Sequence, residues 1–305
     1  MQISEQVAWL RQQAYNGEIT HIRLVHEELM ILRVRPDFGI PPHKAGQYTT
    51  LGLGYWEPRC EGCQEEHLKP GQESKLVKRA YSLSCPLLGS DGELLRREDE
   101  DFLEFYIVLV RQAEKPPALT PRIFCLKEGD RIFVGRKFTG HYTLDAVQPN
   151  QTILFMATGT GEAPHNKMFL ELIRRGHEGP IASIVCVRYQ QDLAYLETHR
   201  RLSERMANYH YITLTTREPW NQGKKIYVQD LVRTGQLEKE LQQPLDPAST
   251  QVYLCGNPLM IGVPKRTKEG YSYPKPTGVI EILESRGFKT DRPRDPGNIH
   301  FEKYW

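Results

Sequence analysis

The sequence predicts two domains, the first built of short antiparallel strands and the second a parallel α/β domain. Its 305 residues exceed one ordinary hydrophobic core and suit two domains of about 150 residues each. The first half contains short runs of alternating apolar residues with few helices, which is typical of an antiparallel barrel or sandwich. After Pro149, apolar strands alternate with helical stretches, which favours a parallel sheet with helices on both faces.

The first predicted domain, residues 1–149, opens with a helix from Ile3 to Ala14. Its predicted strands cover residues 19–25, 29–34, 47–53, 79–84, 103–110, 131–134 and 142–146. Between Gly54 and Lys78 the composition becomes polar and charged with little periodicity. We therefore expect an extended surface insertion there.

The second predicted domain, residues 150–305, has strands over 152–156, 182–187, 210–215 and 252–255. Helices are predicted over residues 166–175, 195–207 and 228–234 between these strands and over residues 276–286 after the last of them. Ligands of such sheets bind beyond the carboxyl ends of the strands. Two turns lie at such ends, Thr158 to Pro164 after the first strand and Cys255 to Pro258 after the last.

The turn after the first of these strands has the geometry of a phosphate-binding site. Gly159 and Gly161 let the main chain approach a ligand, and the N–H groups of the following helix start can point at an anion. The pattern is neither the full dinucleotide fingerprint nor a lysine-bearing phosphate loop. A purely steric need for glycine is therefore an equal alternative.

Composition excludes several function classes. The net charge of +2 and the lack of basic runs interleaved with aromatic residues argue against nucleic-acid binding. No apolar run approaches the roughly 20 residues of a membrane span, and the start does not resemble a secretion signal, so we expect a cytoplasmic protein. Of six cysteines, only Cys60 and Cys63 have a metal-like spacing, and His67 is the only other plausible ligand nearby. We expect two reduced thiols and no metal.

Four segments carry a family resemblance: Arg79-Ala80-Tyr81-Ser82, Thr158 to Pro164, Cys255-Gly256-Asn257-Pro258 and Glu302-Lys303-Tyr304-Trp305. In this order and spacing they resemble the ferredoxin–NADP reductase family, most closely its bacterial branch that ends in an aromatic pair. The resemblance implies an antiparallel β-barrel that binds FAD, followed by a Rossmann-like α/β domain that binds NADP(H). The helix at 3–14, the insertion at 54–78 and the loop at 262–276 depart from the family pattern.

The family's FAD-binding positions fall on Arg79, Ala80, Tyr81, Ser82, Thr120, Tyr304 and Trp305. By this resemblance Arg79 pairs with the diphosphate, Tyr81 offers a planar face to the flavin ring, and Thr120 belongs to a second diphosphate-holding turn. In a regular strand Ser82 faces away from Arg79 and Tyr81, so a local bend must bring its hydroxyl to the flavin N5 edge. The alternative is an edge strand with an incidental arginine and tyrosine.

The family's NADP-binding positions fall on Thr158, Gly159, Thr160, Gly161, Arg188, Arg217, Lys225, Cys255 and Gly256. Arg188, Arg217 and Lys225 are the candidates for holding a 2′-phosphate, and the alternative for each is a solvated surface charge. On this basis we predict that NADPH is preferred over NADH.

The reaction implied by the resemblance passes a hydride between nicotinamide C4 and flavin N5. Four residues match family positions around these atoms: Ser82, Cys255, Glu302 and Tyr304. Cys255 would pack beside the nicotinamide, Glu302 would relay protons or fix the serine, and Tyr304 would cover the flavin face where nicotinamide must land. For Cys255 an inert buried thiol is the alternative.

The expected partner is an acidic ferredoxin or flavodoxin, and we expect a monomer. Candidate basic residues for docking it are Lys44, Arg136, Lys137, Lys265, Arg266 and Lys268. Two rival functions stay open. One is a reductase component that serves an oxygenase or another oxidoreductase, and the other is a non-catalytic flavin-binding regulatory protein.

Overall fold

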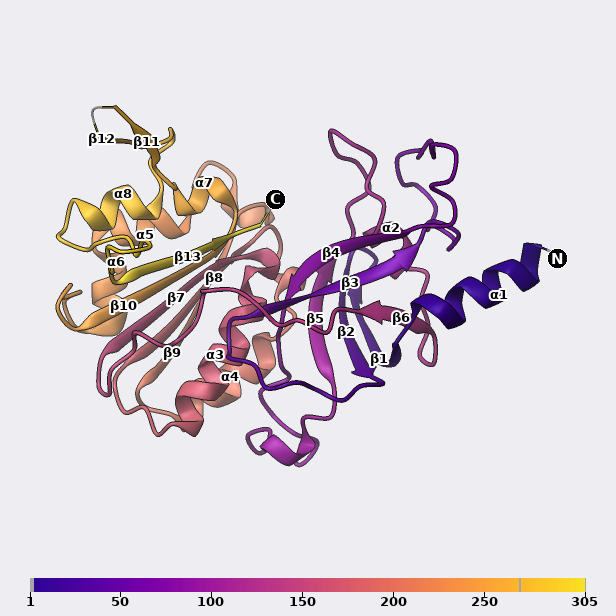
Figure 1. Cartoon of the computed structure of the whole chain (residues 1–305). Coiled ribbons are helices and arrows are strands. Elements are labelled where there is room, and N and C mark those ends of the chain that lie inside the picture. The colour runs from indigo at the N-terminus through magenta and orange to yellow at the C-terminus, as the bar shows by residue number, and fades with distance from the viewer. Residues whose placement is uncertain (1–2, 269, 305) are drawn as a thin grey trace. The chain divides into compact units, whose positions relative to one another are not determined.

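The boundary between the two halves lies earlier than the sequence indicates. The computed structural model describes residues 3–268 and 270–304, and the chain divides into two compact units, Met1–His141 and Tyr142–Trp305 (Figure 1). The strand predicted over residues 142–146 is wrong, because this segment forms bends and turns that belong to the second unit. There the Tyr142 ring packs against Tyr253, with ring centroids 5.6 Å apart, and the Tyr253 hydroxyl donates to the Thr143 carbonyl.

The first unit is a six-stranded antiparallel barrel. Its strands are β1 (Gly17–His26), β2 (Leu29–Pro36), β3 (Tyr48–Gly54), β4 (Leu76–Ser82), β5 (Leu103–Val108) and β6 (Arg131–Val134), in the sheet order β4-β3-β6-β1-β2-β5. A bridge between Ser84 and Glu104 joins the two outer strands and closes the barrel. The helical segments are α1 (Ile3–Ala14), the 3₁₀ turn Arg97–Asp99 and α2 (Thr120–Ile123).

Alternating apolar residues build the interior of this barrel, as the sequence predicts. Leu32, Leu51, Phe105 and Val134 come from four different strands and are fully buried in one core. Each such side chain contributes about 1.5–3 kcal/mol by leaving water. At the end of α1, Arg11 and Tyr15 hydrogen-bond to the same carboxylate, that of Glu57, which fastens this helix to the start of the insertion.

The second unit is a parallel sheet covered by helices on both faces. Its strands are β7 (Thr152–Thr158), β8 (Ile181–Val187), β9 (Tyr209–Thr215), β10 (Thr250–Gly256) and β13 (Ile299–Lys303), in the order β13-β10-β7-β8-β9. The helices are α3 (Glu162–Arg174), α4 (Leu196–Arg205), α5 (Val228–Thr234), α6 (Gln236–Leu241), α7 (Pro258–Ile261) and α8 (Val279–Glu284). The 3₁₀ turns Gly159–Gly161, Gln190–Asp192 and Pro219–Asn221 and the hairpin β11 (Lys265–Thr267) to β12 (Gly270–Ser272) complete the unit.

Period-two alternation in the central strand explains the two helical layers. Leu154 and Met156 of β7 pack into the core formed with α5 to α8, whereas Phe155 faces His165 of α3, with ring centroids 5.0 Å apart. Figure 1 shows α3 and α4 on one face of this sheet and α5 and α8 on the other. Within residues 3–268 and 270–304, no helix combines the length and apolar character that crossing a membrane requires.

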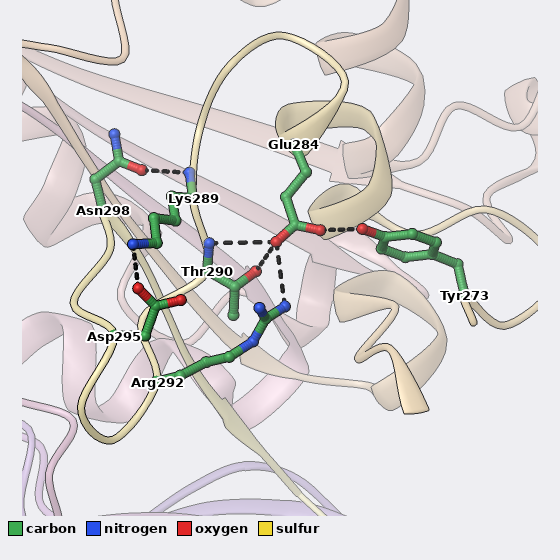
Figure 2. A network of polar contacts seen from close by, with 7 residues as sticks. All are labelled: Tyr273, Glu284, Lys289, Thr290, Arg292, Asp295 and Asn298. Carbon is green, nitrogen blue, oxygen red and sulfur yellow. Dashed lines mark hydrogen bonds and ion pairs between the residues drawn. The ribbon is translucent and has the colours of Figure 1, made fainter. Parts of the chain in front are cut away.

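A polar network places the last strand. Glu284 at the end of α8 accepts hydrogen bonds from Tyr273, from the hydroxyl of Thr290 at 2.7 Å and from Arg292 at 3.4 Å (Figure 2). The same loop is tied at its other end, where the Lys289 main-chain N–H donates to the Asn298 side chain. The segment between α8 and β13 is thereby held on both sides, which fixes the register of β13 beside β10.

Candidate active site

The glycine turn continues directly into its helix. The sequence predicts a helix that begins at Asn166, but α3 begins at Glu162, immediately after the 3₁₀ turn Gly159–Gly161. Gly159 has φ of +53°, a left-handed conformation that favours glycine. The main-chain N–H groups of the turn therefore lie at the carboxyl end of β7, where parallel sheets bind ligands.

Gly161 is required for a different reason. A Cβ atom on Gly161 would lie 2.4 Å from the carbonyl oxygen of Cys255. In return, a Cβ on Gly256, which has φ of +119°, would lie 2.3 Å from the Thr158 hydroxyl oxygen. That hydroxyl accepts a hydrogen bond of 2.7 Å from the Asn257 main chain. The two turns named by the sequence thus interlock at one edge of the sheet.

Three of the four predicted catalytic residues meet at this edge. Cys255 is fully buried in β10 and lies in register with Glu302 of β13, and the main-chain N–H of Tyr304 donates to the Gly256 carbonyl at 3.0 Å. Burial raises the pKa of the Cys255 thiol, the Glu302 charge raises it further, and a hydrogen bond with Tyr304 opposes both. Cys255 is therefore a protonated thiol at neutral pH, in agreement with a packing role.

Tyr142 belongs to this site, although the sequence does not single it out. Its hydroxyl lies 2.7 Å from Nε2 of His165. Burial raises the Tyr142 pKa, and the neighbouring Cys255 and Glu302 raise it further. The sequence does not indicate Tyr142, because this residue directly follows the barrel strands in the chain. In the structure it packs against the sheet of the second unit instead.

The predicted 2′-phosphate residues gather at the carboxyl ends of the next two strands. Arg188 follows β8 and Arg217 follows β9, and the Arg217 N–H donates to the Arg188 carbonyl at 2.8 Å. Lys225 lies in the exposed stretch after β9, and all three side chains are exposed. The Glu218 carboxylate beside them accepts a hydrogen bond of 2.6 Å from the Gln190 main chain.

Aromatic residues lie in the same connections as these cations. Three of them are exposed despite their size: Tyr189 at 39%, Trp220 at 65% and Tyr227 at 42%. Flat apolar faces beside positive charges suit a ligand that carries both a ring and a phosphate. Isolated aromatic residues in loops form no periodic pattern. Only their position after β8 and β9 could have indicated from the sequence that they are candidate ligand-binding residues.

In the first unit, β4 carries Arg79, Ala80, Tyr81 and Ser82 in its second half. Arg79 and Ala80 are exposed, whereas Ser82 is buried and lies in register with Tyr48 of β3. Burial raises the pKa of Tyr81, whose ring meets Phe105 edge-on at 6.3 Å. Ser82 ends the regular strand, because two residues later Ser84 pairs with β5 instead of β3.

Thr120 begins the short helix α2. Its hydroxyl oxygen accepts a hydrogen bond of 3.1 Å from the Val110 main chain, which leaves the hydroxyl hydrogen available for an acceptor. The same helix holds Arg122, a buried cation that pairs with Glu66 of the insertion at 2.7 Å and donates to the Tyr55 carbonyl. The sequence indicates neither Arg122 nor its partner, because the two are far apart in the chain.

The cysteine pair of the insertion is partly exposed, and the Sγ atoms of Cys60 and Cys63 lie 3.5 Å apart. Among the residues that the structure describes, no group of three or more histidine, cysteine or carboxylate side chains is arranged to hold a metal ion.

Comparison with known proteins agrees with this geometry. Residues 155–265 match the family described as the oxidoreductase NAD-binding domain. The chain is 28% identical over 250 residues to a flavodoxin/ferredoxin–NADP reductase of Escherichia coli, covering 80% of this chain and 86% of the relative. It is 29% identical over 271 residues to a ferredoxin–NADP reductase of Pseudomonas aeruginosa, covering 85% and 86%. Over most of its length the chain is therefore similar to reductases of the ferredoxin/flavodoxin–NADP type.

Solved structures have the same two-unit fold as this chain. A ferredoxin NADP+ reductase from Neisseria gonorrhoeae, determined with bound FAD and NADP, is similar with a TM-score of 0.69 at 21% identity, over 95% of this chain and 98% of that one. The reductase from Plasmodium falciparum with 2′P-AMP has a TM-score of 0.65 at 17% identity, over 96% and 97%. Trp305, the remaining predicted FAD residue, lies outside the residues that the structure describes.

Proposed function

We propose that this chain is a ferredoxin–NADP reductase type oxidoreductase, which uses FAD to transfer electrons between NADP(H) and a ferredoxin or flavodoxin. The observation that carries the proposal is the interlock of the two turns, which brings Cys255, Glu302 and Tyr304 beside the glycine turn at one sheet edge. The relatives named as reductases of this type span most of their own length in the match, which supports the same function for the whole chain.

The polar groups of the first unit suit FAD because they are spread along one strand. Ser82 lies at the carboxyl end of β4, and Arg79 lies three residues earlier, about 10 Å away at the usual rise of a strand. Helix α2, which carries Thr120, is connected to the other end of β4. There the Arg122 side chain donates to the Tyr55 carbonyl, and the Tyr55 N–H donates to the Lys75 carbonyl just before β4. An elongated ligand with a diphosphate in its middle fits this spacing. Arg79 and Thr120 would hold the diphosphate, and Tyr81 would present its ring.

Bound FAD would supply the exchange of a hydride with nicotinamide and of single electrons with the protein carrier. The residues of the chain position and protect this chemistry. The Ser82 hydroxyl would donate a hydrogen bond at the reacting edge of the flavin, and Glu302 would accept and return a proton. The Cys255 thiol, kept protonated by burial, would give the nicotinamide ring a neutral, polarisable surface. Tyr304 would exclude water until the nicotinamide arrives.

The second unit suits a dinucleotide with a 2′-phosphate. Main-chain N–H groups of Thr158 to Gly161 would contact the diphosphate at the start of α3. Arg188 and Arg217, joined through their main chains, would hold the 2′-phosphate together with Lys225. NADPH preference over NADH follows.

Charge at one end of the barrel supports an acidic protein partner. Lys44 and Lys137 lie in the two connections beside Tyr48, whose main chain pairs with both Ser82 and Thr139. Arg136 is exposed next to them. Positive charge therefore surrounds the end of β4 that carries Ser82. Such charge raises the association rate with an acidic carrier and loses its effect in salt.

A steady-state assay of ferredoxin or flavodoxin reduction by NADPH tests the proposal. We expect Lys137→Glu to lower the rate at low ionic strength several-fold, whereas Lys127→Glu, at the opposite end of β6, should leave it unchanged. A wild-type rate independent of ionic strength, or equal effects of the two variants, would contradict docking at this end. Turnover of an oxygenase partner but of neither carrier would favour a dedicated oxygenase reductase.

A further inference from the structure

The insertion between β3 and β4 is packed onto α2. The Cys60 main-chain N–H donates to the Pro121 carbonyl at 2.9 Å, and the Gln64 N–H donates to the Arg111 carbonyl at 2.8 Å. Arg59 adds a hydrogen bond of 3.0 Å to the Pro117 carbonyl. The segment that carries Cys60 and Cys63 is therefore an anchored turn rather than a free loop.

This turn brings two thiols together. Gly62 takes a left-handed φ of +73°, which curls the chain so that the Sγ atoms of Cys60 and Cys63 lie 3.5 Å apart. A disulfide needs about 2.0 Å between the two sulfur atoms, so only a short approach separates the present pair from a bond. Both cysteines are partly exposed, whereas Cys85, Cys186 and Cys255 are buried. A small oxidant can reach this pair.

The surroundings distinguish the two sulfur atoms. Burial and the hydrogen bond with Cys63 together raise the pKa of Cys60 to about 11, against the opposing effect of the neighbouring Arg111. Cys60 is therefore the protonated partner at neutral pH. The guanidinium of Arg111 also interacts favourably with a negative charge on Cys63. Because Cys60 holds its proton, Cys63 is the sulfur that reacts first.

We propose that Cys60 and Cys63 form a reversible dithiol/disulfide site that exchanges with low-molecular-weight disulfides such as oxidised glutathione. The Cys63 thiolate attacks one sulfur of the small disulfide, and one molecule of its thiol leaves. Cys60 then gives up its proton and attacks the Cys63 sulfur, which releases the second molecule of thiol. The protein dithiol is oxidised by two electrons, and the small disulfide is reduced to two thiols. This inference does not depend on the proposed electron-transfer function.

Cys125 is the competing partner. It is partly exposed, and its Sγ lies 3.5 Å from the Pro121 carbonyl, the same oxygen that accepts from the Cys60 N–H. A third thiol near the pair could resolve the mixed disulfide instead of Cys60. A test of the site must therefore distinguish a disulfide between Cys60 and Cys63 from a disulfide that includes Cys125.

Mass spectrometry of the intact, purified protein tests the site. After incubation with oxidised glutathione and alkylation of the remaining thiols under denaturing conditions, we expect two of the six cysteines to be unalkylated until dithiothreitol is added. Both should lie in one tryptic peptide, residues 60–75, since Lys69 precedes Pro70, and that peptide should weigh about two mass units less than its reduced form.

Variants identify the roles of the two thiols. Cys125→Ser should form the same bond at the same rate, and Cys60→Ser should retain a glutathione adduct on Cys63. Cys63→Ser should react at least tenfold more slowly at Cys60. A bond to Cys125, a lasting adduct on the wild-type protein, or six alkylated cysteines after the incubation would overturn the proposal. Each of these outcomes is read from mass and does not depend on flavin or NADPH.

Discussion

Replacing Glu162 by glutamine should change how stability depends on pH. Glu162 is the first residue of α3 and is 2% exposed. Its Oε1 accepts a hydrogen bond of 2.8 Å from Tyr211, while Oε2 is buried with no hydrogen-bond partner among the described residues. Burial raises the pKa of this carboxyl to about 7, and the Tyr211 hydrogen bond opposes the rise. The folded protein therefore holds a proton here that the unfolded chain releases.

The size of the effect follows from the two pKa values. Stability from this group is fully present below the ordinary value of 4.5 and is lost as the pH rises through about 7. The free energy of unfolding then falls by up to about 3 kcal/mol over this range because of Glu162 alone. His199 acts in the opposite sense: burial lowers its pKa from 6.5 to about 3, so its contribution is lost as the pH falls. His199 Nε2 lies 3.4 Å from Glu162 Oε1, so the comparison reports the carboxyl group together with its effect on this histidine.

Urea unfolding followed by circular dichroism at pH values from 5 to 8 measures the difference. The wild type should lose about 2.5 kcal/mol relative to Glu162→Gln between the two ends of this range, slightly less than the full value because the range does not cover the whole titration. Glu197→Gln is the matched control, since the Glu197 side chain is 74% exposed on α4. It should follow the wild type throughout. A constant difference between the wild type and Glu162→Gln across the pH range would refute a neutral buried carboxyl group.

Three further predictions use other parts of the chain. Gly161→Ala places a Cβ 2.4 Å from the Cys255 carbonyl oxygen, so urea unfolding should show a loss of about 1–3 kcal/mol and calorimetry should show weaker NADP+ binding. Arg122→Met leaves the nearly buried Glu66 without its ion pair. The free energy of unfolding should therefore fall by about 3–5 kcal/mol. Part of this stability should return in the double variant that also carries Glu66→Gln. Arg217→Ala should raise the Michaelis constant for NADPH about tenfold and leave the Michaelis constant for NADH unchanged. The control Arg201→Ala, on α4, should change neither constant. A parallel rise for both nucleotides would argue against a contact between Arg217 and the 2′-phosphate.

Local patterns in the sequence were sufficient for most of the strands and for the position of the glycine turn. Period-two alternation predicted β1 to β6, and β7 to β10 were visible as apolar runs because both faces of the sheet are covered. The same patterns missed β13, because His300, Glu302 and Lys303 interrupt its apolar residues. They also missed α6 and α7, which are too short for a helical period to emerge.

Pairings between distant residues could not be read from the chain. The register that sets Cys255 beside Glu302 depends on how α8 and its loop place β13. The ion pair of Arg122 with Glu66 depends on the folding of the insertion onto α2. Neither has a signal in local composition, because each results from packing between elements. The resemblance supplied the residue types at the site, and the structure supplied their neighbours.

Anaerobic titration of the purified protein with NADPH, followed in the visible spectrum, tests the central claim most directly. We predict a yellow protein whose flavin absorbance is bleached by NADPH and restored when oxidised ferredoxin or flavodoxin is added, with matching reduction of the carrier. A colourless protein that does not bind added FAD, or a flavin spectrum that NADPH leaves unchanged, would contradict the proposed function.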